Sequence, residues 1–202
     1  SRASELDSEI TEEVLMAHQS GLKVLAAPPR PEMFEEVHAE EVRSVLDYLR
    51  RKYAYVVVDT HCYVDDVTLR VFDASDMIIV VATPDIPAIK DARLVFDLLG
   101  VLEIPRERIF FVLNKMDKKA GITSEAVGEN LKRAVDSEVP MDERTITSSI
   151  NRGVPLIMGD KTKPPAKNVL DLVGAVRQRL VAEPKDEDEE AREPDRPRLL
   201  RR

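Results

Sequence analysis

The sequence predicts an α/β fold, in which a doubly wound and mostly parallel sheet carries helices on both faces. Strand and helix patterns alternate along the chain, the strong strands are apolar at almost every position, and the connections are short. Continuous apolar strands are typical of parallel sheets that are buried on both faces. In such sheets the chemistry gathers beyond the carboxyl ends of the strands.

The first part of the chain predicts two helices and two strands. Apolar residues recur at helical spacing over 5–18 and again over 33–52, with charged residues between them. Residues 22–26 predict a short strand, which the prolines of "APPRPE" end. The segment "YAYVVVD" at 53–59 predicts a strand buried on both faces, with Asp59 at its end.

The remainder of the chain continues the alternation as far as residue 182. We expect its charged, proline-containing tail, residues 183–202, to be disordered. The apolar patterns predict helices over 64–73, 86–102, 125–135 (with an N-cap at Ser124) and 166–182, and strands over 76–84, 108–117 and, more weakly, 134–139.

Composition restricts the classes of protein. The chain has 202 residues and a formal net charge of −8, which argues against general nucleic-acid binding because phosphate backbones are held by basic surfaces. Its single cysteine, Cys62, excludes an intrachain disulfide and fits a reducing cytoplasm. No apolar run approaches the about 18 residues that a membrane-spanning helix needs, so we expect no transmembrane segment.

Asp59 and its neighbours form the first candidate site. A carboxylate at the end of a buried strand can hold the water shell of Mg²⁺ or orient water at a γ-phosphate, but it can equally cap the following turn. Asp65 and Asp66 favour a capping role at the next helix. His61 and Cys62 invite comparison with a zinc site, but no second His/Cys pair exists to complete one.

Polar residues follow three predicted strands, at 59–60, 83–85 and 114–117, and we expect these strand ends to converge. The last of them, "NKMD", matches the Asn-Lys-x-Asp pattern with which GTPases bind guanine. The alternative is a plain turn in which Asn114 and Asp117 bond the local backbone. None of the seven glycines belongs to a G-x-x-x-x-G-K-[ST] loop, so the usual phosphate-binding context of this motif is missing.

Taken together, several segments resemble the MinD/ParA group of deviant-Walker P-loop ATPases. They are "YVVVDT", "DMIIVVATPDIPAIKDARLV", "FFVLNKMD" and "VPMDERTITSSINRGVPLI". Within that group, "SGLKVLAAPPRPE" and "DTHCYVDDVTLR" most resemble CpaE-like proteins of tight-adherence (Flp) pilus assembly. The resemblance covers about residues 5–180 and implies that residues 1–182 are a partial nucleotide-binding domain. The family's Walker A loop, with its signature lysine, lies upstream of the matched region.

The resemblance also implies ATP and Mg²⁺ as cofactors and assigns roles to six residues. Asp59 matches the aspartate after the Walker B strand, expected near the catalytic water and, indirectly, near Mg²⁺. Asn114 matches the asparagine that contacts adenine, and Lys115 stands where many relatives have arginine. Pro140, Met141 and Asp142 match the loop that packs beside the base. This interpretation favours adenine over guanine.

Complete relatives, by this resemblance, are cytoplasmic ATPases that dimerise across the nucleotide and position pilus-assembly or secretion machinery, some of them peripherally at the inner face of the membrane. For this chain as written we expect no hydrolysis and weak or absent nucleotide binding, because the phosphate loop is lacking. Two alternatives stay open. One is a non-catalytic adaptor that binds partners through helix 86–102 or the acidic tail, and the other is a GTPase that uses Asn114 and Asp117.

Overall fold

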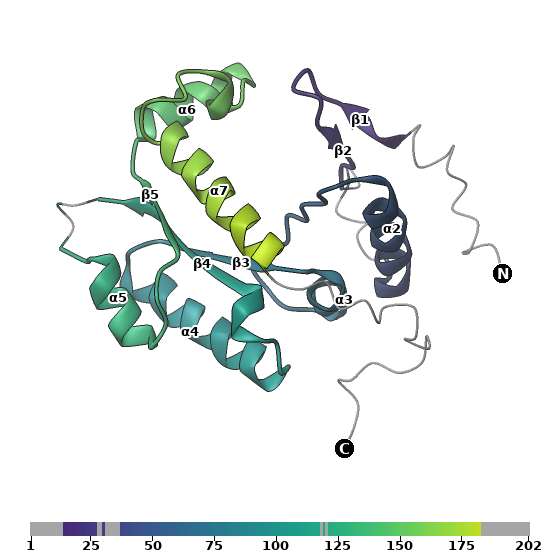
Figure 1. Cartoon of the computed structure of the whole chain (residues 1–202), viewed down its shortest axis with the longest axis horizontal. Coiled ribbons are helices and arrows are strands. Elements are labelled where there is room, and N and C mark those ends of the chain that lie inside the picture. The colour runs from purple at the N-terminus through teal and green to yellow at the C-terminus, as the bar shows by residue number, and fades with distance from the viewer. Residues whose placement is uncertain (1–13, 28–29, 31–36, 118, 120, 183–202) are drawn as a thin grey trace. The chain divides into compact units, whose positions relative to one another are not determined.

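The computed structural model describes residues 14–27, 30, 37–117, 119 and 121–182. The chain divides into two compact units, residues 1–75 and 76–202, which are described separately (Figure 1). The predicted tail over 183–202 and most of the predicted helix over 5–18 lie outside the described residues. No helix among the described residues is long and apolar enough to cross a membrane.

The described residues of the first unit form a small hairpin and two helices. Strands β1 (Met16–Ala17) and β2 (Lys23–Val24) pair antiparallel, so the predicted strand over 22–26 is present in shortened form. Residues 16–17 are therefore a strand rather than the end of the predicted helix over 5–18. Helix α2 (Ala39–Lys52) packs against α3 (Asp66–Ala74), and an ion pair between Arg70 and Glu40 joins them.

The predicted strand over 53–59 is wrong. Residues 54–60 have no regular secondary structure, and Val57 is 89% exposed. A strand is held by hydrogen bonds to a neighbouring strand, and among the described residues none pairs with this segment. The apolar sequence indicates a strand, but without a ladder partner it remains an extended, exposed stretch.

The second unit is built on a three-stranded parallel sheet in the order β3-β4-β5. Its strands are β3 (Ile78–Ala82), β4 (Ile109–Met116) and β5 (Ser137–Pro140). Ile78 lies opposite Ile109 and Leu113 opposite Glu138, so both neighbours of the central strand run in its direction. The parallel sheet of the predicted α/β fold is confirmed.

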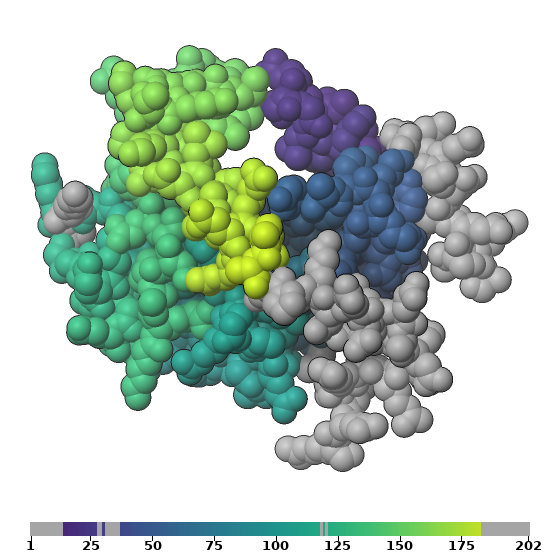
Figure 2. Space-filling model, viewed as in Figure 1, coloured from purple at the N-terminus to yellow at the C-terminus, as the bar shows by residue number. Residues whose placement is uncertain are grey.

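Helices cover the two faces of β4. Phe110 and Val112 face helix α7 (Ala166–Ala182), whose Val169, Leu172 and Val176 pack against them. Phe111 points to the other face, where its ring meets Phe96 of α4 (Ile86–Val101) edge to face, with 5.1 Å between centroids. Helix α5 (Ser124–Leu131) lies beside α4 (Figure 1). The outer side of α7, yellow in Figure 2, forms part of the surface of this unit.

Strand β3 is buried on one face only. Ile78, Val80 and Ala82 are buried, whereas Ile79 and Val81 are exposed, Val81 by 59%. Ile79 lies opposite Phe110, so the exposed face of β3 is the face on which α7 covers β4. The prediction of a strand at 76–84 is confirmed, but its burial on both faces is wrong because α7 reaches β4 and β5 and leaves β3 open.

Helix α6 (Glu143–Arg152) has no counterpart among the predicted elements. Only two of its ten residues, Ile146 and Ile150, are apolar, and although they lie one helical turn apart, two apolar residues alone do not predict a helix. Its ends are set by local contacts, since Asp142 caps the first turn and Gly153 takes a left-handed conformation at φ +61° after the last. Two short 3₁₀ helices, Arg106–Arg108 and Leu156–Met158, complete the described fold.

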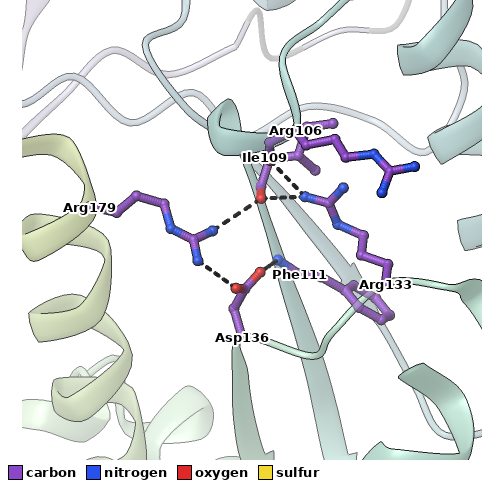
Figure 3. Close-up of polar contacts among 6 residues, drawn as sticks. All are labelled: Arg106, Ile109, Phe111, Arg133, Asp136 and Arg179. Atoms are coloured by element: carbon purple, nitrogen blue, oxygen red, sulfur yellow. Dashed lines mark hydrogen bonds and ion pairs between the residues drawn. The ribbon is translucent and has the colours of Figure 1, made fainter. Parts of the chain in front are cut away.

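A cluster of charged side chains lies at the edge of the sheet where the strands begin (Figure 3). Asp136 accepts a hydrogen bond from the Phe111 amide at 2.7 Å and pairs with Arg179 of α7 at 2.6 Å. Arg133 and Arg179 both donate to the carbonyl oxygen of Ile109, at 2.6 and 3.2 Å. Burial lowers the pKa of Arg133, against the opposing charge of Asp136. The cluster ties α7 and the segment before β5 to the start of β4.

Candidate functional site

Polar residues gather where the three parallel strands of the second unit end. Ala82 lies opposite Leu113, and Met116 lies opposite Pro140, so the carboxyl ends of the strands form one edge of the sheet. The residues at this edge are Thr83, Pro84 and Asp85 after β3, Asn114 to Asp117 at the end of β4, and Pro140, Met141 and Asp142 at the end of β5. The predicted convergence is therefore confirmed for the ends of β3 and β4.

Two of the predicted site segments are joined by a backbone hydrogen bond. The Met141 amide donates to the carbonyl oxygen of Met116 at 2.9 Å, directly after the position where Met116 lies opposite Pro140. Asn114, two residues before Met116 in the chain, is half-buried, and Met141 is 45% exposed. Segments about 25 residues apart in the sequence are thus brought into contact at the edge of the sheet.

Asn114 and Asp117 both bond the local backbone. Asn114 Oδ1 accepts a hydrogen bond from the Lys115 amide at 2.9 Å, and Asp117 Oδ1 accepts one from the Lys119 amide at the same distance. These are the contacts expected of a plain turn. They also engage one carboxylate oxygen of Asp117, the residue that a guanine site would use as an acceptor.

Asp142 and Asp85 cap the two helices that start at this edge. Asp142 Oδ1 accepts from the Thr145 amide at 2.9 Å, and Asp85 Oδ1 accepts from the Ala88 amide at the same distance. Hydrogen bonds from the Thr145 side chain and amide lower the pKa of Asp142, and bonds from the Thr83 hydroxyl and the Ala88 amide lower that of Asp85. Both carboxylates are therefore stabilised as anions at helix N-termini.

Lys115 carries an unusual backbone conformation that no sequence signal indicated. Its φ is +59°, in the left-handed region, although it lies within strand β4. The pairing of β4 with β5 shifts register between Leu113 and Met116, which is the mark of a β-bulge. Lysine has no particular preference for this conformation, so the bulge could not be recognised from residue types.

Asp59 belongs to the first unit and is exposed. The loop after it is organised by His61, whose ring stacks on Tyr63 at 3.7 Å and whose Nε2 lies 3.3 Å from Asp65. Asp65 accepts from the Thr68 amide at 2.8 Å, which confirms it as the N-cap of α3, and this bond lowers its pKa. Asp66 lies in the first turn of the same helix.

The described residues at this edge combine an amide side chain with apolar residues. Asn114 lies at the end of β4, and Pro140 and Met141 lie at the end of the neighbouring strand β5, where Met116 is opposite Pro140. Among the described residues no group of three or more His, Cys, Asp or Glu side chains could hold a metal ion. None of the seven glycines belongs to a G-x-x-x-x-G-K-[ST] loop.

Sequence comparison finds relatives among septum site-determining MinD proteins. The chain is 29% identical to MinD of Emiliania huxleyi over 134 residues, which cover 64% of this chain and 48% of that protein. It is 25% identical to MinD of Synechocystis over 136 residues, 65% of this chain and 50% of that protein. The chain thus spans about half the length of these curated relatives. No protein-family profile matches it.

Solved structures of the same group share the fold. A ParA family ATPase from Chlorobium tepidum matches with a TM-score of 0.78 and 22% identity, over 86% of this chain and 72% of that one. A chain of the MinC:MinD cell division protein complex from Aquifex aeolicus matches with a TM-score of 0.70 and 20% identity, over 91% of this chain and 72% of that one. MinD of Pyrococcus horikoshii with Mg-ADP matches with a TM-score of 0.70 and 18% identity, over 82% of this chain and 68% of that one.

The parallel sheet and the order of its elements agree with the sequence relatives and with the similar solved structures. The chain has the fold of the MinD/ParA-type P-loop ATPases, and its sequence is similar to MinD proteins over 64% to 65% of its length.

Proposed function

We propose that this chain is part of an ATP-dependent switch protein of the MinD/ParA family, of the CpaE-like type, that positions pilus-assembly or secretion machinery. On this proposal the complete protein is a cytoplasmic dimer that associates peripherally with the inner face of the membrane. Sequence relatives named MinD and the shared fold support the family. The segments around Pro29 and Cys62 that resemble CpaE-like proteins support the pilus branch.

One observation carries the nucleotide-binding part of the proposal. The Met141–Met116 hydrogen bond joins the loop of Pro140 and Met141 to the end of β4, the strand that carries Asn114, and this supports a site at the edge of a parallel sheet where ligands of α/β proteins bind. Asn114 would donate to the base, and Pro140 and Met141 would cover one of its faces. Adenine is favoured over guanine because Asn114 matches, by the family resemblance, the asparagine that contacts adenine.

Such a site would make the protein a switch through differential affinity. A ligand shifts an equilibrium only as far as it binds one state better than the other, so ATP would favour the dimer and hydrolysis would release it. Asp59 would act near Mg²⁺ and the attacking water in the complete protein. Lys115, Asp142 and the base-contacting residues would act at the nucleoside end.

A titration with Mg-ATP and Mg-GTP, followed by amide NMR shifts, tests this proposal. We expect weak binding that favours ATP, shift changes centred on residues 114–117 and 140–142, and no turnover. Asn114→Ala should weaken ATP binding about tenfold, the loss of one to two hydrogen bonds in a partly buried site. Asn151→Ala, an exposed asparagine on α6, is the matched control and should leave binding unchanged. Tight, GTP-selective binding would contradict the adenine site.

A non-catalytic adaptor is the second candidate, and the surface of α4 favours it. Ile86, Leu94 and Val101 recur at spacings of eight and seven residues, so they lie along one side of the helix, and all three are exposed. An apolar stripe of this kind is typical of a protein-binding face. If the chain binds no nucleotide, while Leu94→Asp abolishes binding to a pilus-assembly protein, the adaptor is correct and the ATP switch is not.

A further inference from the structure

Lys115 has a left-handed backbone within strand β4, one residue before the strand ends. Among the described residues two other non-glycine positions have positive φ, Glu103 at +56° and Lys132 at +52°. Both follow the last turn of a helix, α4 or α5, where a left-handed residue is an ordinary way to end the helix. Lys115 ends no helix, so its conformation has to be explained by what it does within β4.

The left-handed residue produces the bulge that joins two parts of the candidate site. From Leu113 to Met116 the chain of β4 advances three residues, while β5 advances two, from Glu138 to Pro140. The one extra residue bends β4 and lets Met116 lie opposite Pro140. In that position the Met116 carbonyl accepts the Met141 amide at 2.9 Å.

The same residue also fixes Asn114. The backbone amide of Lys115 donates to Asn114 Oδ1 at 2.9 Å, which orients the side-chain amide of Asn114 with its NH₂ group away from that bond. The side chain of Lys115 itself is exposed. The backbone of Lys115 therefore contacts Asn114 directly and reaches the Met141 loop through the next residue, Met116, whereas the Lys115 residue itself is exposed.

We propose that Lys115 is a positioning residue, whose left-handed backbone rather than its ammonium group aligns Asn114 and the Met141 loop at the base site. The inference rests on the proposed nucleotide-binding function, which it makes more specific. It differs from the role that the family resemblance implies, in which Lys115 is a cofactor-binding side chain.

Three substitutions separate the backbone from the side chain. Lys115→Ala removes the ammonium group and keeps the Cβ, so the backbone preference changes little. Lys115→Gly makes the left-handed conformation easy. Lys115→Val places a β-branched residue where φ is positive, which is strongly disfavoured.

Amide hydrogen exchange of Met141, followed by NMR, reports the alignment directly. The measured quantity is the Met141 exchange rate relative to that of the Phe111 amide. In Lys115→Ala and Lys115→Gly we expect this ratio to stay within about threefold of its value in the unsubstituted chain. In Lys115→Val we expect it to rise at least tenfold. Normalising to Phe111, in the core of β4, separates a local change from general destabilisation. Lys132→Val, at the left-handed cap of α5, is the matched control and should not change the ratio.

The base selectivity is the second readout. Lys115→Ala should keep the ratio of ATP to GTP affinity, and Lys115→Val should bring it to about one, which a merely destabilising change would not do. The inference is overturned if Lys115→Ala accelerates Met141 exchange as much as Lys115→Val, or if Lys115→Val changes nothing. If the unsubstituted chain binds neither nucleotide, the proposed function fails, and the exchange series still decides whether the backbone of Lys115 aligns the loop.

Discussion

Asp136 connects three parts of the second unit through one carboxylate, whose side chain is 14% exposed. One oxygen accepts the Phe111 amide of β4, and the other pairs with Arg179 of α7. Arg133 lies in the same cluster, and burial already disfavours its charge. Without this carboxylate, the positive charges of Arg133 and Arg179 would lose the negative charge that offsets the cost of their partial burial.

We therefore expect Asp136→Ala to lower the free energy of unfolding by about 3 kcal/mol, the low end for the loss of one partner in a buried ion pair, because Arg179 keeps some exposure. Urea denaturation followed by circular dichroism measures it. Asp136→Asn should cost less, since an amide oxygen can still accept the Phe111 amide. Asp171→Ala, an exposed aspartate on α7, is the control. Equal stability of Asp136→Ala and Asp171→Ala would contradict the role of the cluster.

Asp142 makes the start of α6 sensitive to acid. Bonds from Thr145 lower its pKa below the ordinary value of 3.8, so the folded state binds this proton less readily than the unfolded state. The stabilisation is complete above pH 3.8 and is lost as the pH falls through the lowered pKa. In a carboxyl-carbon NMR titration we expect the midpoint of Asp142 below 3.8, with the Thr145 amide shift following it. In Asp142→Asn, where the cap is retained without a charge, the Thr145 shift should lose this transition. A midpoint at or above 3.8 would contradict the contact.

At the scale of elements, the two faces of β3 offer a matched pair of substitutions. Val80 is buried and Val81 is 59% exposed, although they are neighbours of the same type in the same strand. We expect Val80→Ala to destabilise the chain by about 2 kcal/mol, through lost burial and the cavity that remains. Val81→Ala should change stability by less than about 0.5 kcal/mol. Chemical denaturation of both variants checks this, and equal losses would mean that both faces of β3 are covered in solution.

Elements with a strong pattern and a clear boundary could be predicted from the sequence. The predictions for α4, β4 and α7 lie within about one residue of the structure, because each combines a long apolar pattern with a boundary signal such as the cap at Asp85. Part of the sheet edge followed from the same reasoning. Parallel strands bring their carboxyl ends to one edge, so residues 83–85 and 114–117 could be expected to meet there, whereas residues 140–142 were assigned only through the family resemblance.

The rest depends on contacts that residue types do not reveal. The segment 53–59 has the composition of a strand, but a strand also needs a partner for its backbone. Helix α6 is the reverse case, a helix with only two apolar residues, whose ends are set by the caps at Asp142 and Gly153. The bulge at Lys115 has no marker residue, since glycine or asparagine would have indicated it and lysine does not.

At the scale of the whole chain, the described segments differ in how well hydrogen bonds and burial protect their backbone amides from exchange with solvent. In β4 both neighbours supply hydrogen bonds, and the five residues from Ile109 to Leu113 are buried. Residues 54–60 have no ladder, and β1 and β2 are two residues each. Local opening therefore costs little in the first unit outside its helices and close to the global free energy in β4.

Hydrogen exchange with mass spectrometry measures this difference on the intact chain. We expect peptides that cover residues 109–113 to exchange last and peptides that cover residues 54–60 to exchange within seconds, as a segment outside regular secondary structure should. Peptides from α2 should be intermediate, which serves as an internal control that the first unit is folded. Slow exchange over 54–60, comparable to that of β4, would show that this apolar segment finds a strand partner in solution, and it would restore the strand that the sequence predicts ahead of Asp59.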